Sequence, residues 1–183
     1  MQIPSRGAAA VLLAFAACAA EPAAPAPPPA DGARLDHPLQ AAIMALHHST
    51  RRPDRLAGDA AEAALVVARL EYITTALREP QYGAIEPVTV PRLEQARAAL
   101  RAALGIPATL PGATVSAAFA EAARRMAAGD RTGAAEALAP VTGGRPPAAM
   151  LAGLDQLVPP PIVADAVASA EHAWHVRLSP TEE

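Results

Sequence analysis

Two histidines near the C-terminus are the residues whose spacing could support metal chemistry. His172 and His175 are three residues apart in a segment with helical periodicity, so their rings share one helix face and could contact the same ion. A metal site needs further ligands, and Glu171 or Asp165 would have to turn inward to supply them. The chain lacks the Glu-x-x-His pairs of di-iron bundles and the His-Glu-x-x-His motif of zinc hydrolases. The pattern therefore favours surface histidines flanking an anchoring Trp174, and we expect neither a metal nor another cofactor.

The other reactive side chains do not form a catalytic pattern. His47 and His48 are adjacent on an expected helix, so their side chains diverge by about 100° and do not converge on one ion. Ser116 and Ser169 lie in expected helices, without the Gly-x-Ser-x-Gly context of a hydrolase nucleophile. The sequence therefore indicates no catalytic residue, although spacing alone does not exclude a triad, which is a spatial arrangement.

Composition indicates a single domain with a core of small side chains. The chain has 183 residues, which leaves room for one domain of about 150 residues after a leader and a linker. Aromatic residues make up 3 %, and alanine supplies much of the 52 % hydrophobic content, so helices must approach closely to pack well. The net charge of −3 provides no counterion release on nucleic acid, so we expect no nucleic-acid partner. One cysteine excludes an intrachain disulfide.

The first twenty residues have the form of a secretory signal. Arg6 supplies the positive charge, and residues 7–17 form an apolar run too short to span a bilayer as a helix. The run ends in Leu13-Ala14-Phe15-Ala16-Ala17-Cys18. Small residues directly before a lone cysteine resemble the lipobox of bacterial lipoprotein precursors, and the resemblance covers only these residues. It implies a signal peptide over residues 1–17, cleavage before Cys18 and lipidation of Cys18.

Two other fates of the leader stay open. Phe15 occupies the position where a lipobox most often has leucine, and ordinary cleavage after Ala19 or Ala20 would release a soluble periplasmic protein. An uncleaved leader would remain as an apolar helix. In lipoproteins that this leader resembles, a residue such as Ala19 after the cysteine is usually compatible with transfer to the outer membrane. We therefore expect a lipid-anchored protein that faces the periplasm, with the soluble form as the alternative.

A proline-rich tether is expected between the lipidation site and the domain. Residues 18–35 contain the run EPAAPAPPPA at residues 21–30, which cannot form a core and should be extended at about 3 Å per residue. Such a segment would hold the domain about 30 Å from the lipid headgroups. The alternative is an N-terminal tail without a mechanical role. Residues 36–178 are expected to form the helical domain, and residues 179–183 a disordered tail.

One helix, at residues 59–79, is expected at the centre of the domain. Asp59 and Glu62 have the spacing of a capping box, and Pro80 cannot continue a helix. The apolar residues that recur every three or four positions are Val66, Leu70, Ile73 and Leu77. Because more apolar residues lie off this stripe, the helix must be covered on several sides. We expect an all-α fold, a single irregular bundle of about six helices around this one.

The remaining helices follow from apolar periodicity and from the positions of proline and glycine. They are expected at residues 36–52, 91–104, 115–128, 130–139, 147–157 and 162–178. Expected caps are Asp36, Thr114 and Asp130 at N-termini and Gly105 at a C-terminus. On the second of these helices, Glu94, Arg97 and Arg101 are expected opposite the buried face, with Glu94 and Arg97 paired. Tyr82 is expected to fold back onto the core, the alternative being a binding loop.

These features favour an envelope lipoprotein attached to a membrane by its lipid. Its helical domain would have a structural or protein-binding role, and no sequence feature identifies the partner. The alternative is a secreted helical bundle that binds a small ligand or a metal.

Overall fold

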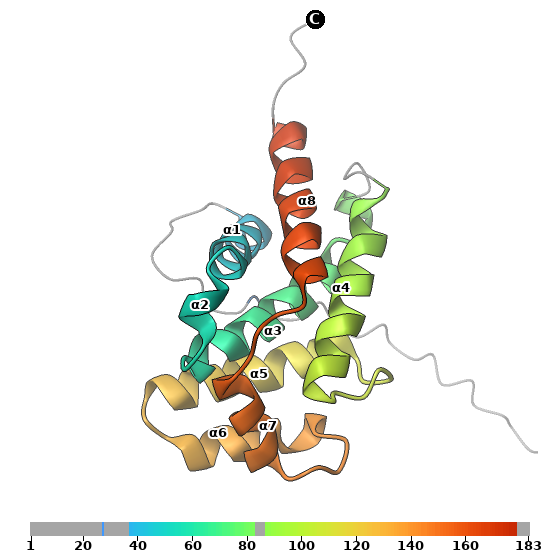
Figure 1. The fold of residues 1–183 in the computed structure, drawn as a ribbon. Coiled ribbons are helices and arrows are strands. Elements are labelled where there is room, and N and C mark those ends of the chain that lie inside the picture. The colour runs from blue at the N-terminus through green and yellow to red at the C-terminus, as the bar shows by residue number, and fades with distance from the viewer. Residues whose placement is uncertain (1–26, 28–36, 83–86, 179–183) are drawn as a thin grey trace, which may run out of the picture.

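The computed structural model describes residue 27, residues 37–82 and residues 87–178, with only the backbone of residues 177 and 178 (Figure 1). The predictions for the signal peptide, for Cys18, for the tether apart from Pro27 and for the C-terminal tail fall outside these residues.

The described part of the chain is all helical. Eight α-helices and two 3-10 turns follow one another: α1 (Pro38–Thr50), α2 (Pro53–Leu56), α3 (Ala60–Ala76), η1 (Pro80–Tyr82), α4 (Thr89–Leu104), α5 (Gly112–Ala127), α6 (Arg131–Leu138), η2 (Ala139–Val141), α7 (Pro147–Asp155) and α8 (Pro161–Leu178). The all-α prediction is therefore confirmed. The expected number of helices was approximate, since the short helix α2 forms where a loop was expected.

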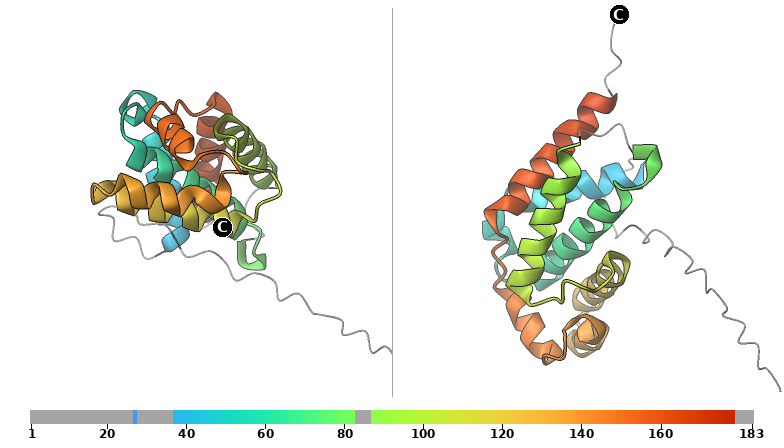
Figure 2. Two further views of the ribbon diagram at one scale, coloured as in Figure 1. Left: turned by 90° about the horizontal axis from the view of Figure 1, so that it is seen from below. Right: turned by 90° about the vertical axis from the view of Figure 1, so that its right-hand side faces the viewer.

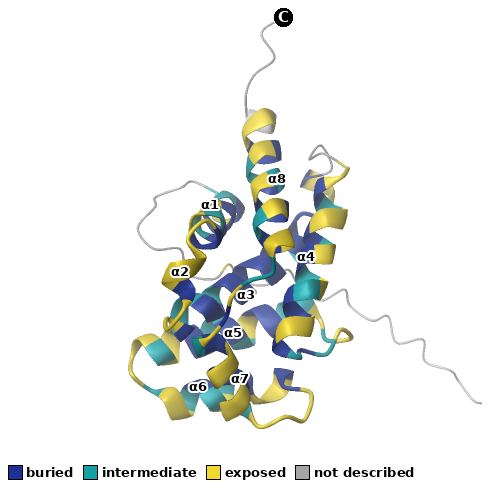
Figure 3. Ribbon diagram, in the orientation of Figure 1, coloured by how far each residue is buried: buried dark blue, intermediate teal, exposed yellow. Residues whose placement is uncertain are grey.

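Helix α3 is the buried centre of this arrangement. Every residue from 66 to 74 is buried, including two charged ones, so no face of this stretch is exposed to water (Figure 3). Helices α1, α4, α5 and α7 all contact α3. The prediction of a central helix is confirmed, because a helix that is apolar over most of its circumference gains most from cover on several sides.

The other helices lie in two groups on either side of α3. Helices α1, α4 and α8 pack together at one end, and α5, α6 and α7 pack together at the other (Figures 1 and 2). Core residues from both groups belong to one hydrophobic cluster that runs through α3. The two groups therefore share their core, and α3 supplies its middle.

Three of the expected capping residues are confirmed. The Asp130 carboxylate accepts a hydrogen bond of 2.8 Å from the Gly133 N–H at the start of α6. Gly105 ends α4 in the left-handed conformation, with φ of 64°, which a residue without a side chain adopts at little cost. Asp59 also caps α3, accepting from the Glu62 N–H at 2.9 Å. The capping box is only half formed, because the Glu62 carboxylate is bound by Ser49 and Arg69 instead.

Three predicted helix ends are wrong by a few residues. Helix α3 ends at Ala76, before Pro80, and the next residues form η1. Helix α5 begins at Gly112, so Thr114 lies inside the helix and does not cap it; Pro111, with φ already at −57°, precedes the first turn. The N-cap of α1 is His37, whereas Asp36 lies outside the described residues.

Candidate functional site

The predicted metal candidates do not come together with further ligands. His172 is exposed on α8, and His175 Nε2 lies 2.8 Å from Glu171 Oε1 one turn away. Among the described residues, no group of three or more His, Cys, Asp or Glu side chains is placed to hold an ion. Trp174 between the two histidines is buried, as the sequence predicted. This end of α8 therefore anchors the helix through the indole and exposes the imidazoles.

The serines considered as nucleophiles bond to the backbone or to another helix. The Ser116 hydroxyl donates to the Ala68 carbonyl at 2.9 Å, joining α5 to α3. The Ser169 hydroxyl accepts from Arg92 at 2.9 Å, joining α8 to α4. Neither hydroxyl lies in a pair with a histidine in the described residues. Both hydroxyls therefore connect two helices, and this structural role accounts for the two serines.

An aromatic cluster of His37, Tyr82 and Trp174 lies at the N-terminus of α1. The ring centroids of His37 and Trp174 are 5.1 Å apart, and those of Tyr82 and Trp174 are 6.1 Å apart. His37 Nε2 lies 3.1 Å from the Tyr82 hydroxyl oxygen. Tyr82 is therefore folded onto the core, as predicted, and joins α1 to α8.

The contacts of His37 define its proton positions. Its Nδ1 accepts the Leu39 N–H at 3.2 Å as the N-cap of α1, so Nδ1 carries a lone pair. In the neutral ring, Nε2 then carries the proton and donates it to Tyr82. The cluster therefore holds the N-terminus of α1 against α8.

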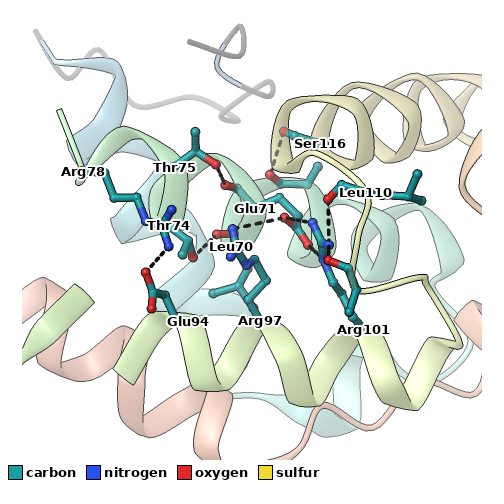
Figure 4. A network of polar contacts seen from close by, with 12 residues as sticks. Leu70, Glu71, Thr74, Thr75, Arg78, Glu94, Arg97, Arg101, Leu110 and Ser116 are labelled. Carbon is teal, nitrogen blue, oxygen red and sulfur yellow. Dashed lines mark hydrogen bonds and ion pairs between the residues drawn. The ribbon is translucent and has the colours of Figure 1, made fainter. Parts of the chain in front are cut away.

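The largest polar network lies between α3, α4 and the loop before α5 (Figure 4). Arg101 binds the Glu71 carboxylate with two hydrogen bonds, Nε to Oε1 at 2.5 Å and Nη2 to Oε2 at 2.7 Å. Both side chains are buried, at 5 % and 2 % exposure. Such a two-point geometry is the strong form of an arginine–carboxylate contact.

The remaining donor of Arg101 fixes the loop before α5. Its Nη1 lies 3.3, 3.1 and 2.9 Å from the carbonyl oxygens of Pro107, Ala108 and Leu110. Arg97 reaches the same carboxylate of Glu71 at 4.0 Å, and burial lowers the pKa of this arginine while Glu71 opposes the shift. The network therefore connects two helices and a loop, and both oxygens of the buried Glu71 carboxylate contact an arginine.

This network corrects the predicted faces of α4. Arg101 was expected on the exposed face and is buried, because the loop over residues 107–111 covers it. Arg97 is only partly exposed. Glu94 pairs with Arg78 on the preceding segment and not with Arg97.

A second buried arginine, Arg69, lies near the middle of α3 and pairs with Glu62 in the first turn of the same helix. Arg69 is 2 % exposed and its Nη1 donates to Glu62 Oε1 at 2.7 Å, while the Ser49 hydroxyl lies 2.5 Å from the same oxygen. Both buried arginines therefore have carboxylate partners. The charged side chains of α3 are used in contacts within the domain.

Two cavities open along α4. One, of about 290 Å³, lies at the end of α4 against α7 and is lined by Ala103, Met150, Gly153, Leu157 and Val158 among others. The other, of about 370 Å³, lies near the start of α4 against α8 and is lined by Arg92, Gln95, Ile162, Asp165 and Ala166. Val158, between α7 and α8, is 69 % exposed, and Ile162, in the first turn of α8, is 36 % exposed. We call the two cavities with these two side chains the α4 surface.

Comparison with protein-family models, with curated proteins and with solved structures finds no match to this chain. Among the described residues, none of the helices has the length and apolar character needed to cross a bilayer.

Sequence reasoning missed the Glu71–Arg101 network and the α4 surface. The signal for the first was a glutamate inside the apolar stretch of residues 66–74, since a carboxylate buried there needs a cation. The signal for the second was weaker, a valine and an isoleucine on either side of three prolines at residues 159–161.

Proposed function

We propose that this chain is a lipid-anchored envelope protein whose helical domain binds another protein. The observation that carries the binding role is the α4 surface, where Val158 is 69 % exposed and lines one cavity and Ile162 is 36 % exposed and lines the other. An exposed large apolar side chain at a hollowed surface is the kind of feature that a partner covers. The leader ending in Cys18 supports the anchor.

The polar groups of the domain support binding rather than catalysis. The buried charged side chains are bound within the domain. Glu71 pairs with Arg101, which also binds backbone carbonyls, and Glu62 pairs with Arg69 and Ser49. The cavities of about 290 and 370 Å³ are at the low end of the range for drug-sized ligands, which favours side chains of a partner as their occupants. The alternative, a secreted bundle for a small ligand, has less support from these volumes.

The anchor is tested by mass spectrometry of the mature N-terminus and by fractionation of a Cys18→Ser variant. A lipid-modified Cys18 as the first residue, and release of the variant from the membrane fraction, are expected. If the variant stays membrane-bound and is processed as before, the anchor proposal is wrong.

The binding role is tested by photo-crosslinking in cells. A photoreactive residue at Val158 should form an adduct with a second protein, whereas the same residue at Val176, a valine on α8 that is 60 % exposed, should not. Adducts of equal yield at both positions, or at neither, would remove the α4 surface as the binding surface. This outcome is independent of the anchor experiment.

A further inference from the structure

Three neighbouring arginines differ from all the others in the described chain. Nine of the twelve arginine side chains that the structure describes have a hydrogen-bond or ion-pair partner within that part: Arg69, Arg78, Arg92, Arg97, Arg101, Arg124, Arg125, Arg131 and Arg145. The three without one there are Arg51, Arg52 and Arg55, all exposed at the junction of α1 and α2. We call these three the arginine patch.

The arginine patch borders a cavity between the end of α1 and the start of α3. This cavity has a volume of about 200 Å³ and is lined by His48, Ser49, Arg52, Arg55, Leu56, Asp59 and Glu62. It is smaller than the usual pocket for a drug-sized ligand and has room for a single small group. Helix α2, which carries Arg55, is exposed on the outside of the molecule (Figure 3).

Helix stabilisation explains only part of this arrangement. Arg51 and Arg52 follow the C-terminus of α1, where a positive charge interacts favourably with the helix dipole. The dipole does not use the guanidinium donors, which form a planar fork suited to two oxygens of one anion. Arg55 belongs to the four-residue helix α2, which has almost no dipole to complement.

The lining of the cavity carries two arginines and two carboxylates, and Arg69 from outside the lining offsets one of these carboxylates. The Glu62 carboxylate is neutralised by Arg69 at 2.7 Å and bound by Ser49. The Asp59 carboxylate accepts the Glu62 N–H as the cap of α3 and has no ion-pair partner in the described part of the chain. Asp54 is exposed beside Arg55 and is not among the residues that line the cavity.

We propose that Arg52 and Arg55 bind one phosphate group in this cavity, with Arg51 adding to the attraction from outside. The ligand chemistry is a phosphate oxyanion, carried by an anionic lipid headgroup or by a soluble phosphate. Asp59 opposes this binding by its charge. The proposal concerns a surface other than the α4 surface and does not depend on the proposed function.

The test is a titration of the mature full chain in micelles of a neutral glycoside detergent with inorganic phosphate. The side-chain Nε–Hε signals of Arg52 and Arg55 should shift in a saturable manner, and so should the backbone amide signals of Leu56 and Asp59, which line the same cavity and report on binding in every variant. The Arg52→Gln/Arg55→Gln variant should bind about tenfold more weakly. Its melting temperature should stay close to that of the parent, because the variant loses only the interaction of Arg52 with the α1 dipole and neither side chain has a partner in the described part of the fold.

Two further variants separate a site from general attraction. Arg124→Gln/Arg131→Gln removes the same charge from arginines that are 68 % and 57 % exposed, and should leave phosphate affinity unchanged. Asp59→Asn keeps the cap of α3 and removes the opposing charge, so affinity should rise about twofold. Equal weakening by both double variants, weaker binding by Asp59→Asn, or no saturable shift would each overturn the proposal.

The source of the phosphate is distinguished in the same micelles. Short-chain phosphatidylglycerol that shifts the same arginine signals at lower concentration than inorganic phosphate would identify a lipid headgroup as the ligand. A response to inorganic phosphate alone would identify a soluble phosphate. A response to phosphatidylglycerol that is equal in the parent and the Arg52→Gln/Arg55→Gln variant would overturn the assignment to this cavity.

Discussion

Glu71 and Arg101 show what single residues contribute to this fold. Both are buried in a domain with few large side chains, where an unpaired charge would be costly. Their two hydrogen bonds, and the three carbonyls that Arg101 also binds, offset the loss of water around both charges. The main effect of the pair is therefore to hold the loop before α5 against α4, and its contribution to net stability is small.

Removing one partner of this pair should be strongly destabilising. Arg101→Met leaves a buried carboxylate and three loop carbonyls without their donor, and should lower the free energy of unfolding by about 3–5 kcal/mol. Combined with Glu71→Met, the loss should be partly recovered, because the carboxylate is then gone. Urea denaturation of both single variants and the double variant measures the coupling.

The exposed pair of Arg78 and Glu94 provides the control. Arg78 is 55 % exposed, so Arg78→Met should cost less than about 1 kcal/mol. If Arg101→Met were no more destabilising than Arg78→Met, the buried network would not hold the loop as described.

At the scale of elements, the close approach of α5 to α3 depends on a glycine. A Cβ built on Gly112 would lie 2.6 Å from Thr75 Oγ1 and 3.2 Å from Glu71 Oε2. The first turn of α5 can therefore rest on α3 only without a side chain at this position.

Gly112→Ala should consequently lower stability by about 1–3 kcal/mol, since Thr75 is held by its bond to the Glu71 carbonyl and cannot simply move away. Adding Thr75→Ala removes the clashing oxygen and should recover much of the loss. Gly153→Ala in α7 is the matched control, because its new Cβ meets only Leu104 at 3.8 Å, and it should be neutral or stabilising. Equal effects of the two alanines in thermal unfolding would contradict this account.

The turn between α5 and α6 should make stability sensitive to acid. The Gly133 N–H and then Arg125 lower the pKa of Asp130 below its ordinary 3.8, and a hydrogen bond from Arg125 lowers the pKa of Glu121 below 4.5. Because both pKa values are lower in the folded state, the carboxylates stabilise the fold above their ordinary pKa values. This contribution is lost as the pH falls through the lowered values.

Asp130→Asn separates the charge from the cap. Asparagine keeps the N-cap of α6 but loses the ion pair with Arg125, so the melting temperature at pH 7 should fall by about 2 °C. The difference from the parent should shrink as the pH falls below the ordinary Asp pKa of 3.8, because Asp130 then becomes protonated in the parent at its lowered pKa. A difference that stays constant over this range in a series of thermal melts would show that the charge is not responsible.

The positions of the helices were more predictable from the sequence than the set of side chains that each helix buries. Helices follow from apolar periodicity and from proline and glycine positions, signals that lie within each segment, and the all-α fold and the central α3 were predicted from them. Burial of Arg101 depends on its pairing with Glu71, 30 residues away in the sequence, and on the path of the loop over residues 107–111, so the periodicity of α4 alone does not reveal it. The α4 surface was not predicted for the same reason, because three elements create it together.

At the scale of the whole molecule, α3 joins two groups of helices that have no separate cores. The stretch over residues 66–74 is buried on all sides, and the hydrophobic cluster includes residues of α1 and α8 as well as of α5 and α7. Removal of either group would expose an apolar side of α3. Neither group should therefore unfold before the other.

The single tryptophan allows this cooperativity to be measured. Trp174 fluorescence reports on the α1–α8 end, and far-UV circular dichroism reports on all helices, so their urea transitions should have the same midpoint. A Trp174→Phe/Phe119→Trp variant moves the reporter to α5 at the other end of α3 and should again match its own dichroism. If Trp174 changed first and the relocated tryptophan changed with the remaining helicity, the α1–α8 end would be an independent unit, and α3 would not unite the domain.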